Sequence, residues 1–474
     1  MTGWSLLLFC LASPLSIDEK GKEKRMIHQF KFKNSNIIMD IHSGSIHIVD
    51  DVTYAIAGPA ESLSKEEVMS QFSSEYAESE IAEAYDELMT LKEQGMLYTI
   101  DQYEKLVPAF LEREPVVKAL CLHVAHDCNL KCRYCFAGEG EYHGHRGMMS
   151  LEVAQQSVDF IIENSKHRKN IEIDFFGGEP LMNWEVVKGT VEYARSREAE
   201  TGKNFRFTMT TNGVLLNDEI IDYLNENMYN VVLSLDGRKE VNDYMRPTAN
   251  GKSSYEVILP KFKKLVEKRG GKQYYVRGTF THHNLDFMED VKHIHDQGFN
   301  EVSVEPVVAP NTADYAIQPE DIGTLCKEYE KLAKYMLEKT NKGEGFNFFH
   351  FMIDLEGGPC IHKRLAGCGS GTEYLAVTPE GDLFPCHQFV GIDEFKMGTV
   401  YEGVTNKEMR SRFEKCNVYS KSECKSCWAK FYCSGGCAAN SYNFHGDIHH
   451  VYEIGCELQK KRLECAIGIK AECL

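Results

Sequence analysis

The stretch that decides the fold runs Ala119-Leu-Cys-Leu-His-Val-Ala125, then His-Asp, then Cys128-Asn-Leu-Lys-Cys132-Arg-Tyr-Cys135. The residues 119–125 are mostly apolar and predict a buried strand. The three cysteines are separated by three and then by two residues, so one loop can wrap three thiolates around a cube of iron and sulfide. The alternatives are three buried cysteines without a ligand or a partial zinc site, but structural zinc takes four ligands, usually from two pairs. The loop therefore predicts an iron–sulfur cluster at the end of a strand.

Three thiolate ligands leave one iron of a [4Fe–4S] cube open, because a fourth cysteine would close it. An open iron can chelate the amino and carboxylate groups of S-adenosylmethionine (SAM) and hold its sulfonium beside the cluster. Reduction of the cluster would then split SAM and yield a 5′-deoxyadenosyl radical, which is chemistry that a cofactor supplies. Cys128, Cys132 and Cys135 are therefore the candidate catalytic and metal-binding residues, and Tyr134 is a candidate to lie against the adenine.

Strand-like runs alternate with helical patterns through the middle of the chain. The strands are expected at 119–125, 171–176, 205–210, 230–235, 273–280 and 301–308. This alternation predicts βαβ units and a parallel sheet. Six such units predict an α/β fold with a partial (β/α)6 barrel over residues 115–345, and the chemistry of such barrels lies at the carboxyl ends of the strands.

Polar or glycine-rich motifs lie at that edge. They are Phe176-Gly177-Gly178-Glu179-Pro180, Thr211-Asn212-Gly213 and Ser234-Leu-Asp236-Gly237, together with Arg277 on the fifth strand. Glycines permit close approach of the main chain to a ligand. The side chains of Asn212, Ser234 and Asp236 are candidates for the ribose hydroxyls, and Arg277 is a candidate fork for the SAM carboxylate. Although Asn-Gly and Asp-Gly alone mostly mark turns, the motifs together predict a SAM pocket.

A second group of cysteines lies after residue 350, where regular periodicity fades. Its spacing is Cys424-x2-Cys427-x5-Cys433-x3-Cys437, with Cys456 nineteen residues later and Cys368 and Cys386 upstream. The region 350–474 looks too irregular to be held by apolar packing alone, so metal ligation could supply the missing constraint. Zinc ribbons favour two C-x2-C pairs, and this spacing contains one. His387 could form a hydrogen bond near a cluster, but we favour its interpretation as a solvated histidine.

The N-terminal part predicts a small separate module. Alternating runs at 28–32, 37–41 and 46–49, with turns between them, predict a three-stranded antiparallel sheet. Helical patterns follow at 65–73 and 79–94, and the module is expected to span 26–110. The residues 1–25 are expected to be an unstructured extension, because their apolar stretch lacks the basic start of a signal peptide.

Composition excludes several classes of partner. The chain has 474 residues and a net charge of −18, so it offers no basic field for nucleic acid. No segment is long enough to span a bilayer, so we expect no membrane partner. The 17 cysteines are many for an intracellular chain, but a protein of this length needs no disulfide framework. Oxygen-sensitive clusters favour a reducing, cytoplasmic location.

The cysteine loop resembles the signature of the radical SAM superfamily, and the Gly-Gly-Glu-Pro motif looks like the family's motif that holds the SAM amino group. The later cysteines resemble the SPASM extension of these enzymes. From Met26 onward the chain resembles the maturases of six-cysteines-in-forty-five (SCIFF) peptides. The carrying stretches are Asn36-Ile-Ile-Met-Asp-Ile-His-Ser-Gly-Ser-Ile-His-Ile-Val-Asp-Asp51, His126-Asp-Cys-Asn-Leu-Lys-Cys-Arg-Tyr-Cys-Phe-Ala137, Gly367-Cys-Gly-Ser-Gly371 and Thr378-Pro-Glu-Gly-Asp-Leu-Phe-Pro-Cys-His-Gln-Phe389.

The resemblance implies three [4Fe–4S] clusters. Beyond the SAM cluster, it assigns Cys368, Cys386 and Cys437 to one auxiliary cluster, and Cys424, Cys427, Cys433 and Cys456 to another. Cys360 stands where some relatives have a fourth ligand to the first auxiliary cluster. The remaining cysteines are expected to have no role; they are Cys10, Cys121, Cys326, Cys416, Cys465 and Cys473.

The resemblance also implies a substrate. Residues 26–110 would be a winged-helix-like element that binds the leader of a cysteine-rich precursor peptide, and a sheet with an open edge can take such a peptide as an added strand. The reaction would join a cysteine of the precursor to one of its threonines by a thioether, with an external electron donor of flavodoxin or ferredoxin type.

Two other functions remain open at this point. A sulfatase-maturating enzyme, which forms formylglycine, shares the auxiliary clusters but normally starts almost at the three-cysteine loop, whereas 127 residues precede Cys128 here. A non-enzymatic iron–sulfur electron carrier would need no SAM pocket.

Overall fold

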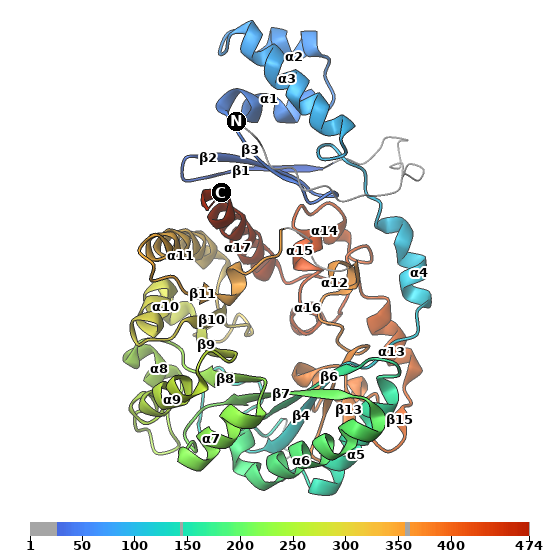
Figure 1. Cartoon of the computed structure of the whole chain (residues 1–474), viewed down its shortest axis with the longest axis vertical. Coiled ribbons are helices and arrows are strands. Elements are labelled where there is room, and N and C mark those ends of the chain that lie inside the picture. Colours follow the sequence, from blue (N-terminus) through green and yellow to red (C-terminus); the bar gives the residue numbers. More distant parts are fainter. Residues whose placement is uncertain (1–25, 143–145, 356–360, 474) are drawn as a thin grey trace.

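The computed structural model describes residues 26–142, 146–355 and 361–473. Figure 1 shows the barrel at one end, a small N-terminal module at the other, and the C-terminal elements between them. The extension 1–25 and Cys360 lie outside the described residues.

The N-terminal module is an antiparallel sheet with helices on one side. The strands β1 (Ile27–Phe32), β2 (Ser35–Asp40) and β3 (Ile46–Val49) pair in that order. The helices are α1 (Asp51–Ala60), α2 (Lys65–Phe72) and α3 (Glu78–Glu93). The three predicted strands and the two predicted helices are confirmed. α1 was not predicted, because Gly58-Pro59 near its end reads as a break in a helical pattern.

The sheet of the module faces two cores. Ile38 on β2 packs with residues of the three helices, such as Ile56 and Ile81. On the opposite face, Phe32 and Ile37 belong to the core that runs through the rest of the molecule. The sheet is therefore shared between the module and the body of the protein.

The barrel contains the six expected strands. They are β4 (Ala119–His126), β6 (Asn170–Gly177), β7 (Asn204–Thr211), β8 (Asn230–Ser234), β9 (Tyr274–Phe280) and β10 (Glu301–Pro306). Each is parallel to its neighbour, in the order of the chain. The fold class, an α/β partial barrel, is confirmed.

Helices follow the strands on the outside of this sheet (Figure 1). They are α5 (Leu151–Asn164), α6 (Trp184–Thr201), α7 (Asp218–Asn227), α8 (Lys239–Met245), α9 (Tyr255–Arg269), α10 (Phe287–Asp296) and α11 (Ile322–Asn341). The short strand β5 (Gly147–Met148) pairs with the end of β4, and β11 (Asn347–Phe348) pairs with β10.

The C-terminal region continues the barrel sheet. β12 (Tyr374–Val377) lies parallel to β4, and β13 (Asp382–Phe384), β14 (Gly398–Thr399) and β15 (Gly403–Val404) follow as antiparallel neighbours. The helices are α12 (Ile361–Ala366), α13 (Lys407–Glu414), α14 (Ser422–Lys425), α15 (Lys430–Cys433), α16 (Ala438–His445) and α17 (Glu453–Glu472).

Apolar packing contributes more to this region than its irregular sequence suggested, and whether metal ligation is needed as well stays a prediction. Phe389, Phe395 and Phe413 are buried and their rings contact one another. The helix α17 was missed as well, because charged residues interrupt its apolar positions. Apolar contacts therefore hold much of the region, although they do not exclude metal ligation by its cysteines.

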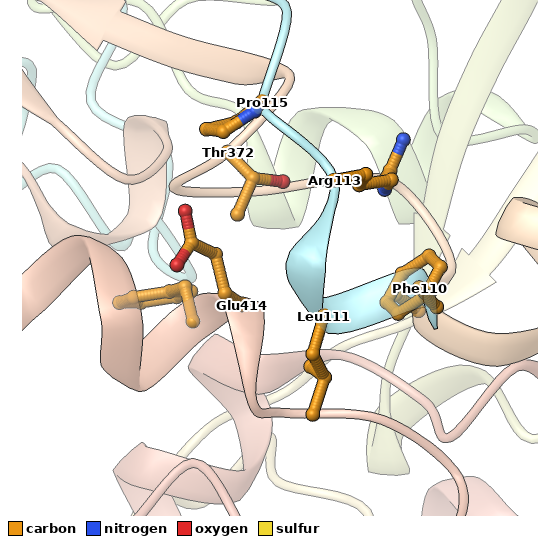
Figure 2. A pocket seen from close by; sticks show the side chains of 8 residues that line it. Phe110, Leu111, Arg113, Pro115, Thr372 and Glu414 are labelled. Carbon is orange, nitrogen blue, oxygen red and sulfur yellow. The ribbon is translucent and has the colours of Figure 1, made fainter. Parts of the chain in front are cut away.

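A linker connects the module to the barrel along the outer side of the molecule. It contains the short helix α4 (Val107–Glu112). Figure 2 shows Phe110, Leu111 and Arg113 of this linker around a small pocket, across from Glu414 of α13. Arg113 pairs with Glu373 at 2.7 Å, which fixes the linker against the strand β12. The pocket is lined by packing residues and contains none of the described cysteines.

Within the described ranges, no helix is both long enough and apolar enough to cross a membrane.

Candidate functional site

The three cysteines after β4 lie together at the carboxyl edge of the barrel. Burial raises the pKa of the Cys128 thiol to about 12, and the nearby Cys132 and Cys135 act in the same direction. Burial also raises the pKa of Cys132 to about 11, against the opposing charge of Arg246. The three predicted cysteines are therefore close enough for their charges to interact.

The segment after α8 holds this loop in place. The backbone N–H of Lys131 donates to the carbonyl of Pro247 at 3.0 Å, and that of Arg133 donates to Met245 at 2.9 Å. Such pairing fixes the path of the loop between its cysteines. It was not predicted, because more than a hundred residues separate the two segments.

The surroundings of the sulfur atoms fit thiolates bound to iron. Cys128 accepts a hydrogen bond from the backbone N–H of Leu130, and Asn212 Nδ2 lies 3.7 Å from its sulfur. Buried donors also remain near the loop, because Arg246 Nε and Asn129 Nδ2 have no partner among the described residues. Hydrogen bonds to the sulfurs are a known means of tuning such clusters.

The two glycines of the Gly-Gly-Glu-Pro motif pack against the cysteine loop. A Cβ on Gly177 would lie 2.3 Å from the carbonyl oxygen of Ala125, and one on Gly178 would lie 2.1 Å from that of Asp127. The N–H groups of Gly178 and Glu179 donate to the same two carbonyls at 2.7 and 2.9 Å. Both positions therefore require glycine because the backbone of the cysteine loop leaves no room for a Cβ, whether or not a ligand is bound.

Gly178→Ala is expected to displace the cysteine loop and to lower iron binding by about four atoms per chain, the content of one cluster. The added methyl would overlap a backbone oxygen that has no side-chain freedom to move away. Iron analysis after anaerobic reconstitution measures this. Gly323→Ala is the matched control, because no atom lies within 4 Å of its Cβ position. An unchanged iron content in Gly178→Ala would contradict the expectation.

Glu179 is buried, and its carboxylate ties the second strand to the third. It accepts hydrogen bonds from Thr211 Oγ1 and from the N–H of Asn212, both at 2.7 Å. It also accepts one from the N–H of Leu181 at 3.0 Å, next to the buried Pro180. Burial raises the pKa of Glu179. The carboxylate therefore positions Asn212 beside Cys128.

Tyr134 belongs to a buried polar group with Asp236 and Arg246. Its hydroxyl lies 2.8 Å from both carboxylate oxygens of Asp236, and Arg246 Nη1 donates to it at 2.8 Å. Burial raises the pKa of Asp236 to about 6. The N–H of Thr279 also donates to Asp236. The assignments of Tyr134 to adenine and of Asp236 to ribose remain predictions, and both side chains already have protein partners.

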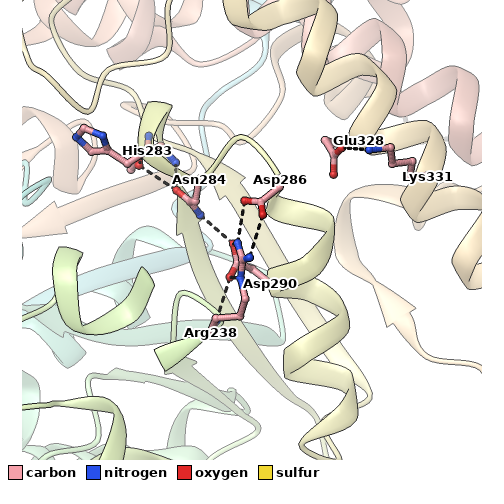
Figure 3. Close-up of polar contacts among 8 residues, drawn as sticks. Arg238, His283, Asn284, Asp286, Asp290, Glu328 and Lys331 are labelled. Carbon is pink, nitrogen blue, oxygen red and sulfur yellow. Dashed lines mark hydrogen bonds and ion pairs between the residues drawn. The ribbon is translucent and has the colours of Figure 1, made fainter. Parts of the chain in front are cut away.

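A second polar network supports the turn after Asp236. Figure 3 shows Arg238 between Asp286 and Asp290. Arg238 Nε donates to Asp290 at 2.9 Å, and Asn284 Nδ2 donates to the same buried carboxylate at 3.0 Å. A Cβ on Gly237 would lie 2.3 Å from Asp290 Cβ, so this carboxylate packs against the turn.

Ser234 and Arg277 are neighbours on β8 and β9. Arg277 forms an ion pair with Glu305 of β10 at 2.9 Å, and its side chain is 46% exposed. His350 Nε2 lies 3.6 Å from the same carboxylate. Arg277 thus has a protein anion as its partner, and its role toward the SAM carboxylate remains a prediction.

The C-terminal cysteines form two sets. The Cys386 thiol is buried, which raises its pKa, and its charge interacts with those of Cys437 and Cys368. Backbone N–H groups donate to the sulfurs of Cys386 and Cys437. These contacts join the residues that the resemblance assigned to the first auxiliary cluster.

The second set lies on α14, on α15, on the loop between them that carries Cys427, and on the first turn of α17. Burial raises the pKa of Cys424 to about 12 and that of Cys456 to about 12. Cys456 interacts with Cys433, Cys424 and Cys427. The backbone N–H groups of Gly435 and Gly436 donate to Cys433. The sulfur environment again fits a cluster ligand.

Other cysteines have different surroundings. The Cys416 thiol donates to the carbonyl of Ile448 at 3.3 Å, so it carries its proton. Cys121 and Cys465 are fully buried in the core. These thiols fit the prediction that they are not ligands, which stays untested.

The interpretation of His387 as solvated is wrong. Its ring lies 5.6 Å from that of Phe136 and 5.0 Å from that of Phe176, and burial lowers its pKa to about 4. Sequence reasoning also missed Tyr142, whose hydroxyl donates to the carbonyl of Gly177. Burial raises the pKa of Tyr142, and the charges of Cys121, Cys135, Cys128 and Cys386 act in the same direction.

A sequence profile of the radical SAM superfamily matches residues 122–296. The radical SAM cyclopropyl synthase TigE of Paramaledivibacter caminithermalis is 22% identical over 452 residues, which cover 90% of this chain and 92% of TigE. The serine-type anaerobic sulfatase-maturating enzyme of Bacteroides thetaiotaomicron is 26% identical and covers 68% of this chain and 82% of its own length.

Two groups of solved structures have the same fold. AnSMEcpe with bound AdoMet has a TM-score of 0.63 and 21% identity, and it covers 74% of this chain and 97% of its own. Streptococcus suis SuiB bound to S-adenosylmethionine has a TM-score of 0.54 and 18% identity, and it covers 90% of this chain and 98% of its own.

Proposed function

We propose that this chain, which belongs through residues 122–296 to the radical SAM superfamily, is a peptide maturase that installs thioether cross-links between cysteine and threonine in a cysteine-rich precursor. The observation that carries the proposal is the arrangement of three separate cysteine sets with an N-terminal sheet docked beside the last of them. The family implies SAM and a [4Fe–4S] cluster as cofactors, and the two further clusters belong to the proposal.

Similar proteins support a peptide substrate. One solved structure is that of anSMEcpe with bound AdoMet and the Cp18Cys peptide, and another is that of SuiB bound to the precursor peptide SuiA. SuiB covers 90% of this chain, so the likeness includes the N-terminal module as well as the barrel.

The reduced cluster, when bound by Cys128, Cys132 and Cys135, would supply an electron for the cleavage of SAM to a 5′-deoxyadenosyl radical. The protein itself fixes the loop geometry through Gly177, Gly178 and the carboxylate of Glu179. Asn212 places a donor beside the Cys128 sulfur. Ser234, Asp236 and Arg277 line the same edge and are the proposed SAM contacts.

The precursor would lose one hydrogen atom, one proton and one electron for each thioether formed, and the sulfur–carbon bond replaces an S–H and a C–H bond. Cys368, Cys386 and Cys437 would hold the group that accepts the electron. The second set, Cys424, Cys427, Cys433 and Cys456, would hold a further such group. A flavodoxin or ferredoxin is the proposed external electron donor.

The edge strand β3 is the proposed site for the leader of the precursor. β3 pairs on one side with β2, and no backbone hydrogen bond from another described strand meets its other side. Ile48 on this strand is 48% exposed. An extended peptide can pair with such an edge and bury the exposed side chain.

Ile48→Ala is expected to weaken leader binding about fivefold, because truncation removes apolar area that the peptide would cover, worth about 1 kcal/mol. Titration of a fluorescently labelled precursor measures the affinity. Val257→Ala is the matched control, because Val257 is also exposed but lies on the barrel helix α9. Equal affinities of the two variants would show that the leader binds elsewhere.

The decisive experiment combines the reconstituted protein with SAM, a reductant and a short cysteine-rich peptide encoded beside its gene. We expect 5′-deoxyadenosine, together with a peptide that has lost two hydrogens and one alkylatable thiol for each cross-link. A peptide that reacts with a hydrazide would instead indicate formylglycine, the second candidate, which the similarity to sulfatase-maturating enzymes favours. Absence of 5′-deoxyadenosine would leave the electron carrier as the function.

A further inference from the structure

His28 of β1 contacts two segments that carry ligands of the second auxiliary set. Its ring stacks on that of Trp428 with a centroid distance of 3.7 Å and an angle of 4°. Its Nε2 lies 3.1 Å from Glu464 Oε1, and both side chains are largely buried. Trp428 directly follows Cys427, whereas Glu464 lies on α17, the helix that carries Cys456 in its first turn.

The segment 419–431, which contains α14, contributes further contacts to the module. Lys430, between Cys427 and Cys433, forms a buried ion pair with Asp101 at 2.8 Å. Tyr419 also donates to Asp101, at 2.7 Å. The rings of Tyr103 and Phe431 lie 4.8 Å apart. Removing one partner of a buried ion pair leaves an uncompensated charge, so these contacts fix the module in one position.

The helix α17 provides the opposite side of the docking surface. Phe32 lies directly against Gly468, where a Cβ would stand 2.3 Å from the ring. Glu472 accepts hydrogen bonds from Lys33 and Ser35, both at 3.0 Å. The module therefore rests at once on α17 and on the segment around Trp428 (Figure 1).

The second auxiliary set has ligands on both sides of this docking surface. Three of them, Cys424, Cys427 and Cys433, come from the segment around Trp428, and Cys456 comes from α17. A shared cluster would fix the distance between Trp428 and Glu464. That distance is what His28 needs in order to contact both. Metal ligation of this kind is a common source of folding free energy.

We propose that the second auxiliary set acts as a latch for the N-terminal module: ligation of one group by these four cysteines holds Trp428 and Glu464 at the spacing that docks His28. The inference rests on the proposed function only in that the docked module presents the leader to the barrel. The latch assigns the second auxiliary site a mechanical role beside electron transfer, and it makes precursor delivery depend on complete cluster assembly.

Hydrogen exchange of β1 and β2 in the full-length, anaerobically reconstituted protein tests the latch without any precursor or product. In Cys456→Ser, exchange of residues 27–40 is expected to accelerate about tenfold or more. The reason is that the free energy of local opening of the docked sheet falls by about 1.4 kcal/mol. Exchange of β6 and β7 in the barrel should stay unchanged. Unchanged exchange of residues 27–40 would overturn the proposal.

A double-mutant cycle separates a latch from general damage to the region. His28→Ala leaves all four cysteines in place and should also accelerate the exchange of residues 27–40, with the full iron content kept. Combined with Cys456→Ser, it should add little, because both changes break the same coupling. Additive effects of the two changes would show independent roles and would overturn the latch, whatever substrate the enzyme has.

Discussion

Replacing Cys128, Cys132 and Cys135 together by alanine is expected to abolish reductive cleavage of SAM and to lower the iron content from about twelve to about eight atoms per chain. The three thiols lie in one electrostatic neighbourhood, with a donor from Asn212 beside Cys128. Iron analysis and 5′-deoxyadenosine production after anaerobic reconstitution measure the two effects.

Cys121→Ala is the matched control, because this cysteine lies on the same strand as the loop but is buried in the core. It should keep about twelve iron atoms and full SAM cleavage. Residual cleavage in the triple variant would contradict the assignment of the site. Zinc at stoichiometric amounts in the purified protein, with iron near about four atoms, would contradict the auxiliary clusters.

Cys386→Ala is expected to lower formation of cross-linked peptide by about 100-fold or more, equivalent to about 2.7 kcal/mol, while 5′-deoxyadenosine is still produced. Cys386 is buried, and its sulfur accepts a hydrogen bond from the backbone N–H of Gln388. Its loss removes a ligand from the first auxiliary set and leaves the SAM loop intact. The ratio of product to 5′-deoxyadenosine measures this uncoupling.

Cys416→Ala is the control for that variant. Cys416 interacts with Cys368 of the same set, but its thiol donates to the carbonyl of Ile448 and so remains protonated. An unchanged product ratio is expected. A Cys386→Ala enzyme that stays fully coupled would remove the first auxiliary set from the reaction.

The barrel could be predicted because its strands are apolar or alternating runs separated by amphipathic helices. β4 is buried along its whole length, whereas buried residues alternate with more exposed ones along β6 and β7. The C-terminal strands escaped prediction for a physical reason. β13, β14 and β15 have three residues or fewer, and such strands leave no periodic pattern to recognise.

The cysteine sets follow directly from their spacing, since thiolates that share a cluster must lie on short loops. The residues that surround the cysteines cannot be predicted in this way. Arg246 stands in a sequence without a recognisable motif and reaches Tyr134 of the loop only through the fold. The contact between Asp101 and Lys430 joins residues that are far apart in the chain, so no local sequence pattern predicts it.

The position of β12 beside β4 has a consequence for synthesis of the protein. β4 lies between β6, which follows it closely, and β12, which is more than half the chain away. During synthesis on the ribosome, the edge of β4 that pairs with β12 therefore stays unpaired until β12 has been synthesised. Open edges are where nascent sheets pair with the wrong partner. Chains cut before Tyr374 should accordingly need chaperones or aggregate, even though they contain every strand of the barrel.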